Sequence, residues 1–192
     1  MADDGNDAFV GLEAAWQRSE MVNTAASHGR EGLYFINLVP SSIDDPGLDL
    51  AVTMETLFYA GMHPGNLVFK IMESDLARDP AHALRIRKYL DRRGFGFALN
   101  TAGFGAGAYS FQAVSDFAPN YISLDARLIR NIDRGGTSCA PAISKLIHMG
   151  EKCGACVIAE GVDRLRTVEN LWLLGVQFMQ GQLFGDPLPY SG

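Results

Sequence analysis

Basic residues are scarce in this sequence of 192 residues, and nowhere do they gather. Sixteen Lys and Arg residues stand against 22 Asp and Glu residues, which gives a formal net charge of -6 at pH 7. A protein that binds nucleic-acid phosphates needs a concentrated basic face. Polynucleotides are therefore not expected as partners.

Long apolar runs are missing as well. No run reaches the roughly 20 residues that a bilayer-spanning helix needs, and the opening MADDGND lacks the basic and then apolar order of a secretory signal. We expect no membrane association and a cytoplasmic location. The 47% hydrophobic and 20% charged residues are typical of a globular domain. Because no linker or low-complexity tract divides the chain, a single domain over residues 1–192 is expected.

Only three cysteines occur, and two of them, Cys153 and Cys156, have C-x-x-C spacing. An odd number of cysteines in a chain of this size favours reduced thiols. A structural zinc site would want four ligands, and the sequence has no second pair. We expect neither a metal nor a cofactor here, only two small residues near the start of a strand.

What the sequence does contain is a regular alternation of short apolar runs and amphipathic segments, typical of βα units around a parallel sheet. Six strands are predicted: Leu33–Leu38, Leu67–Met72, Phe95–Asn100, Tyr121–Asp125, Cys156–Glu160 and Gln177–Gln180. Helices are predicted between them: Leu48–Ala60, Ala81–Arg93, Ser110–Phe117, Ala140–Met149 and Arg164–Leu174. An additional helix is expected at about residues 8–27, before βα units that extend over about residues 33–190.

Polar residues lie at or just after the ends of these strands. In parallel α/β folds the carboxyl ends of the strands carry the chemistry. The candidates are Asn37, Lys70, Glu73, Asn100, Thr101, Ser123, Asp125, Glu160 and Gln180. Side chains from six strand ends that face one mouth would make a site.

A glycine-rich loop supplies one functional interpretation. Residues 103–108, GFGAGA, fit the pattern G-x-G-x-x-A, and Asp125 closes the next predicted strand. The pattern is that of a dinucleotide site, with pyrophosphate at a helix N-terminus and the acidic residue on a ribose hydroxyl. The loop follows the third predicted strand, whereas such a fingerprint belongs to the first βαβ unit. An oxidoreductase is one interpretation of this loop.

The C-terminal third carries a longer pattern. The runs VIAEGVD at 157–163 and QGQLFGDP at 180–187 resemble the end of the EAL domain, the cyclic di-GMP phosphodiesterase family. Upstream, FINLVP at 35–40, LVFKIMES at 67–74, ALNT at 98–101 and YISLD at 121–125 are similar to further family motifs. The resemblance covers roughly residues 30–190. It implies an α/β fold, an EAL-type (TIM-like) barrel that is here incomplete, with about six parallel strands and surrounding helices.

The resemblance also implies a reaction in which carboxylates hold two divalent cations that activate water. Asn37, Glu160 and Gln180 match the family's residues. Four of its positions are replaced, by Lys70, Asn100, Thr101 and Ser123. Hard cations depend on carboxylate oxygens, and the charge of Glu160 is offset by that of Lys70.

These replacements predict a protein that is not an enzyme, with no catalytic residue and no bound metal. The expected function is that of a non-catalytic, regulatory or protein-interaction module in bacterial cyclic di-GMP signalling. Weak or no cyclic di-GMP binding is expected, because the family's N-terminal Arg is missing, although Lys70 could supply positive charge in place of the metals. The remnant ligand site would comprise Asn37, Glu73, Asp125, Glu160 and Gln180.

Two alternatives stay open beside this one. A metal-dependent cyclic di-GMP phosphodiesterase would require Glu13 to be the family's N-terminal Glu and other ligands to replace those that are lost. Glu13 precedes Asn37 by too few residues to hold the helices that the family places between them. The other alternative is the dinucleotide-binding oxidoreductase.

Association with a partner is expected from the strand count. Six strands cannot close the barrel that eight strands close, so the first and last strands would present unpaired backbone groups. The apolar interior would be open there, at Phe35, Phe97, Ile158 and Phe178. We expect a homodimer or a protein partner that buries the face formed by Phe9, Leu12 and Trp16.

Overall fold

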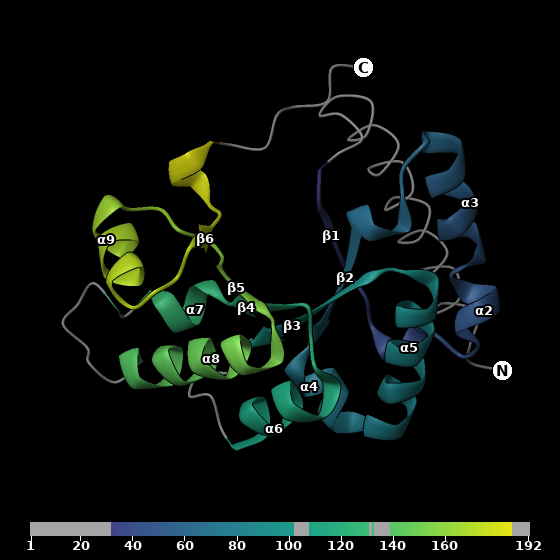
Figure 1. Ribbon diagram of the computed structural model, residues 1–192, viewed down its shortest axis with the longest axis horizontal. Helices are drawn as coiled ribbons and strands as arrows, with labels where there is room; N and C mark the ends of the chain where they lie inside the picture. Colours follow the sequence, from purple (N-terminus) through teal and green to yellow (C-terminus); the bar gives the residue numbers. More distant parts are fainter. Residues whose placement is uncertain (1–31, 102–107, 131, 133–138, 186–192) are drawn as a thin grey trace, which may run out of the picture.

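A computed structural model describes residues 32–101, 108–130, 132 and 139–185 of the chain. Its core is one sheet of six strands in which spatial order follows chain order and every neighbouring pair is parallel. The strands are β1 (Tyr34–Asn37), β2 (Leu67–Met72), β3 (Gly96–Thr101), β4 (Tyr121–Leu124), β5 (Cys156–Ala159) and β6 (Phe178–Met179). The sheet curls into half a barrel (Figure 1), which confirms the expected fold class and six strands.

Helices connect the strands. They are α2 (Pro46–Asp49), α3 (Ala51–Ala60), α4 (Glu73–Arg78), α5 (Pro80–Arg93), α6 (Ala108–Phe117), α7 (Ala126–Ile129), α8 (Ala140–Cys153) and α9 (Leu165–Leu173), with the short 3-10 turns η1 (Pro40–Ser42), η2 (Pro64–Asn66) and η4 (Gln182–Phe184). Figure 1 shows α4, α5, α6 and α8 along one side of the curled sheet. Helix α5 packs on β3, and α8 packs on β4 and β5.

The two faces of the sheet differ in burial. The face under the helices is closed and apolar, made by Leu67, Phe69, Ile71, Phe97, Leu99, Ile122, Leu124, Val157 and Ala159. Because side chains alternate along a strand, the residues between these point to the other, concave face. That face is more open: Lys70, Tyr121 and Ile158 are only partly buried. The concave face is therefore where the fold can offer polar groups to a ligand.

Local chain signals account for most element ends. Asp79 caps α5, where its side chain accepts a hydrogen bond from the backbone N–H of His82 (2.9 Å), and Pro80 takes the first helical position. Gly94 ends the helix in the left-handed conformation, with φ of 78°. The single helix predicted for Leu48–Ala60 is wrong, because the turn capped by Asp45 stops at Asp49 and α3 starts afresh at Ala51.

The half-barrel has two edge strands in the part of the chain that the structure describes. Strands β1 and β6 each pair with one neighbour, and no described strand joins them. Ile158 and Phe178 lie opposite each other in the register, and Phe178 is 52% exposed. Phe97 was expected in the barrel interior, and this is wrong: its ring lies on the helix-covered face against Arg87 and Phe117. The N-terminal helix and the interaction residues Phe9, Leu12 and Trp16 lie outside the described residues, as does the glycine-rich loop at 102–107.

Arg87 ties this outer layer together. Its guanidinium lies 5.2 Å from the centre of the Phe97 ring, donates to the carbonyl oxygens of Phe117 and Ala118 (3.1 Å each) and pairs with Asp91. We expect Arg87→Met to lower the free energy of unfolding by about 2 kcal/mol, because two carbonyls lose their partner in a buried position. Urea denaturation measures this change. Lys88→Met, on the exposed side of the same helix, is the control, with an expected change within about 0.5 kcal/mol.

Two further observations concern the sequence predictions. Cys139, Cys153 and Cys156 are all free thiols. Cys156 opens β5, as expected for a residue at the start of a strand, whereas Cys153 is the last residue of α8. Across the described segments, no helix is both long enough and apolar enough to cross a bilayer. The cytoplasmic location stays a prediction.

Candidate functional site

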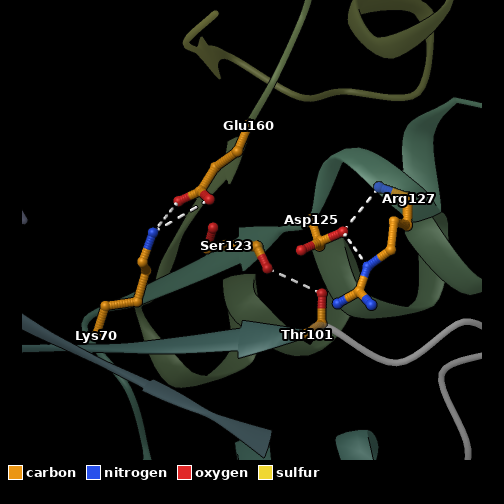
Figure 2. A network of polar contacts seen from close by, with 6 residues as sticks. All are labelled: Lys70, Thr101, Ser123, Asp125, Arg127 and Glu160. Atoms are coloured by element: carbon orange, nitrogen blue, oxygen red, sulfur yellow. Dashed lines mark hydrogen bonds and ion pairs between the residues drawn. The ribbon is translucent and has the colours of Figure 1, made fainter. Parts of the chain in front are cut away.

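The strand ends of the concave face are joined by an ion pair. Lys70, on β2, extends across β3 and β4 to Glu160, which directly follows β5. Its Nζ donates to Glu160 Oε1 at 2.9 Å and to Oε2 at 3.1 Å (Figure 2). Both side chains are largely buried, with 13% and 18% exposed. The register places Ala98 beside Lys70, and its small side chain leaves room for the Lys70 side chain to extend over β3.

Next to the ion pair lie two polar groups without a partner. Asn100 and Ser123 are opposite each other in the β3–β4 register, and only 9% and 2% of these residues are exposed. Asn100 Oδ1 and Ser123 Oγ make no hydrogen bond within the described part of the chain. A buried polar atom without a partner costs free energy, and such atoms at a mouth are suited to hold a ligand or water.

Thr101 does not join this face. Its side chain alternates to the other side of β3 and is only 1% exposed, and its Oγ1 donates to the backbone carbonyl of Ser123 at 2.8 Å. Figure 2 shows this bond and the position of Ser123 between Thr101 and the ion pair. Thr101 therefore ties the ends of β3 and β4 together.

Two predicted remnant residues have local roles. Asp125 does not close β4. It caps α7, its Oδ1 accepting from the backbone N–H of Arg127 (2.7 Å) and from the Arg127 guanidinium (3.0 Å). Glu73 begins α4, directly after β2. Figure 2 shows the Asp125 carboxylate turned to Arg127.

Gln180 and Asn37 flank the mouth at the two sheet edges. The backbone N–H of Gln180 donates to the carbonyl of Ala159 (2.9 Å), and the Gln180 carbonyl accepts from Val162 (3.0 Å). The segment that carries Glu160 is thus held by β6 on one side. Asn37 ends β1 opposite Lys70 and is exposed. Of the predicted candidates, Asn37, Lys70, Asn100, Ser123, Glu160 and Gln180 lie at or near the carboxyl ends of the strands.

Sequence reasoning missed Tyr121, which lies deeper on the concave face. Its ring meets that of Phe35 edge to face, with centroids 5.3 Å apart. Burial, and after it the charge of Cys156, raises the pKa of the Tyr121 phenol above its usual value of 10. The phenol is therefore protonated at neutral pH and can donate a hydrogen bond. Only the alternation of side chains along the predicted strand could have indicated that it lies on the concave face.

The residues at this mouth do not fit a centre for two divalent cations. The one carboxylate among them, Glu160, already has the ammonium of Lys70 as its partner, and the neighbouring side chains are neutral. Nowhere among the described residues do three or more His, Cys, Asp or Glu side chains gather as metal ligands. A dication would have to displace Lys70.

Comparison with known proteins decides the family. The sequence model of the family described as EAL domain matches residues 11–187. This chain belongs to the EAL domain family. The match includes Glu13, which lies outside the described residues.

The curated relatives carry enzyme names. The cyclic di-GMP phosphodiesterase RocR of Pseudomonas aeruginosa is 32% identical over 130 residues, which are 66% of this chain and 31% of that protein. The cyclic di-GMP phosphodiesterase PdeF of Escherichia coli K12 is 25% identical over 156 residues, 81% of this chain and 20% of that protein. The chain therefore spans less than a third of the length of these relatives. The expectation that it is not an enzyme is wrong by this comparison: the relatives are named as phosphodiesterases, and the matches give no sign of inactivity.

Solved structures agree on the fold. BlrP1 of Klebsiella pneumoniae, in a complex with manganese and cyclic di-GMP at pH 9.0, superposes with a TM-score of 0.79 at 26% identity, over 91% of this chain and 44% of that one. The EAL domain of Xanthomonas citri FimX, in complex with cyclic di-GMP, has a TM-score of 0.82 at 18% identity, over 98% of this chain and 74% of that one. The second likeness shows the fold alone.

The oxidoreductase interpretation is wrong. A dinucleotide-binding sheet reverses its strand order at a switch point, whereas this EAL domain runs from β1 to β6 without reversal. Asp125, which was to bind a ribose hydroxyl, caps α7.

Proposed function

We propose that this EAL domain recognises cyclic di-GMP at the mouth of its half-barrel and exerts its regulatory role through that ligand. The observation that carries the proposal is Lys70, whose ammonium stands at the carboxyl ends of the strands on the concave face. A phosphodiester carries one negative charge and acceptor oxygens, and Lys binds such a group as a point charge.

The rest of the mouth supplies hydrogen-bonding groups for the same ligand. Asn100 and Ser123 offer unpartnered oxygens, and Tyr121 offers a protonated phenol on the same face. The binding is expected to be weak, in the micromolar range, because Glu160 competes with the phosphate for Lys70. The expected homodimer or protein partner stays a proposal, since Phe9, Leu12 and Trp16 are not among the described residues.

Calorimetric titration tests the recognition. Cyclic di-GMP added to the purified chain is expected to release or absorb heat with saturation at micromolar ligand, whereas NAD gives dilution heat only. If no saturable heat appears up to millimolar cyclic di-GMP, the proposed function is wrong.

Cleavage of cyclic di-GMP is the second candidate, and the names of the relatives favour it. At this mouth the residue able to accept the proton of an attacking water is Glu160. The water would give a proton to Glu160, its oxygen would bond to phosphorus, one ester P–O bond would break, and the leaving sugar oxygen would take up a proton to give the linear dinucleotide. Chromatography detects this product. If this candidate is right, the linear product exceeds that of a control without protein and disappears in Glu160→Gln. If no product forms, the function is recognition without cleavage.

A further inference from the structure

The charge at the mouth bears on how a ligand is held there, an inference that rests on the proposed function. We propose that Lys70 takes the place of a divalent cation, so that this domain binds the phosphodiester of cyclic di-GMP without any metal ion. Glu160 then serves to hold the ammonium in position until the ligand arrives.

The charges of Lys70 and Glu160 cancel at the mouth. A phosphate that enters a mouth lined by carboxylates needs cations to overcome repulsion. Here the pair of Lys70 and Glu160 is neutral, so a phosphodiester meets no net negative charge. The ammonium has three N–H donors, and Glu160 takes up donation at two oxygens, 2.9 and 3.1 Å away.

Two buried polar atoms without a hydrogen-bond partner lie at the same strand ends as Lys70 and Glu160. Asn100 Oδ1 and Ser123 Oγ are shielded from solvent yet have no hydrogen-bond partner in the described structure. Ser123 Oγ–H can donate to a phosphate oxygen, whereas Asn100 Oδ1 only accepts and suits an N–H donor of the guanine bases or a water molecule. An ammonium and a hydroxyl donor at the same strand ends suit one singly charged phosphodiester. Figure 2 shows Ser123 at the ends of the strands that Lys70 and Glu160 span.

Lys70 is held in place by Glu160 but is not sealed off from a ligand. The Lys70 side chain is 13% exposed, so it is largely but not completely buried. Its stem leaves β2 between Asn37 of the edge strand β1 and Ala98 of β3. A ligand phosphate can replace Glu160 as the partner of the Lys70 ammonium while the strand register stays the same.

The sign of one substitution separates this site from a metal site. In a cation-dependent site, Glu160→Gln removes a ligand of the metal and weakens binding. In the site proposed here it removes a competitor for Lys70 and a charge that repels phosphate. We expect Glu160→Gln to tighten cyclic di-GMP binding about three- to tenfold, and Lys70→Met to weaken it about ten- to hundredfold.

The experiment measures the affinity for cyclic di-GMP by calorimetry in EDTA and in millimolar Mn²⁺. The same dissociation constant is expected in both, with Lys70→Arg retaining more affinity than Lys70→Met. The matched control is Lys88→Met, the same chemical change on the outside of α5, which should leave the affinity unchanged. Thermal melting of each variant confirms that it folds.

The outcomes are distinct. Binding that requires Mn²⁺ overturns the inference and leaves the proposed function standing. The inference is also overturned, with the proposed function still standing, if binding without metal persists in Lys70→Met or becomes weaker in Glu160→Gln. Absence of binding in both buffers overturns the proposed function itself.

Discussion

A cation site is expected to appear in this EAL domain when Lys70→Glu is combined with Asn100→Asp. The unaltered chain satisfies Glu160 with an ammonium, at 2.9 Å. A Glu side chain at position 70 is shorter than Lys, so its carboxylate would face that of Glu160 across a gap suited to an ion. Asp at position 100 would add a third carboxylate at a place where an oxygen now has no partner.

The double variant should be less stable than the parent in EDTA, because like charges meet in a partly buried place. Mn²⁺ should reverse this. At a free concentration of one hundred times the dissociation constant, the ion adds about 2.7 kcal/mol to the free energy of unfolding. Thermal melting at several Mn²⁺ concentrations and direct titration measure the effect, and the parent chain should show no such stabilisation.

The control carries the charge change of Lys70→Glu alone at a remote exposed place, Lys88→Glu. It should not respond to Mn²⁺. An equal Mn²⁺ response in the parent, the control and the double variant would show nonspecific binding, and no response in the double variant would mean that Glu160 and position 70 cannot share an ion.

A second large effect is expected at Gly181, which lies between β6 and the turn η4. Its φ of 154° is one that side chains rarely adopt, and a Cβ there would meet the backbone of Val162. That backbone is bound on both sides: Val162 donates to Gln180 and accepts from Leu183 (3.0 and 3.2 Å). We expect Gly181→Ala to lower the free energy of unfolding by about 3–5 kcal/mol, through backbone strain and forced displacement together.

Gly154→Ala is the matched control, because Gly154 also has a positive φ, 73°, but nothing lies within 4 Å of its would-be Cβ. It should cost about 1–2 kcal/mol. Urea denaturation compares the two. Equal losses would show that the contact with Val162 is not tight, whereas a larger loss for Gly181→Ala, with weaker cyclic di-GMP binding, would show that this contact positions Glu160.

Much of the fold could be predicted from local pattern. The strand Leu67–Met72 was predicted to the residue, since six apolar or large side chains stand between an Asn and an acidic segment. The predicted ends of β4 and β5 were off by one residue each, because Asp125 and Glu160 follow the strands rather than belong to them. The short elements α4 and α7 were missed, since four to six residues carry too little periodicity.

The sequence predicted which residues lie at the candidate site better than it predicted how they are arranged. Strand ends alone indicated Asn37, Lys70, Ser123 and Glu160. The sequence could not separate a site role for Asp125 and Glu73 from a helix-end role, because a carboxylate after a strand serves equally well as a helix cap or in a first helical turn.

The amino-acid sequence was sufficient for the parallel βα order and for the EAL family, because alternation of apolar runs and long motifs are local properties of the chain. It was also sufficient for the net charge of the mouth. Only the tertiary structure decided that Lys70 and Glu160 meet, that Phe97 faces the helices and that Gly181 approaches Val162. Those contacts depend on how far the sheet curls and on which face each side chain takes, and these follow from strand twist and register across residues up to 90 positions apart.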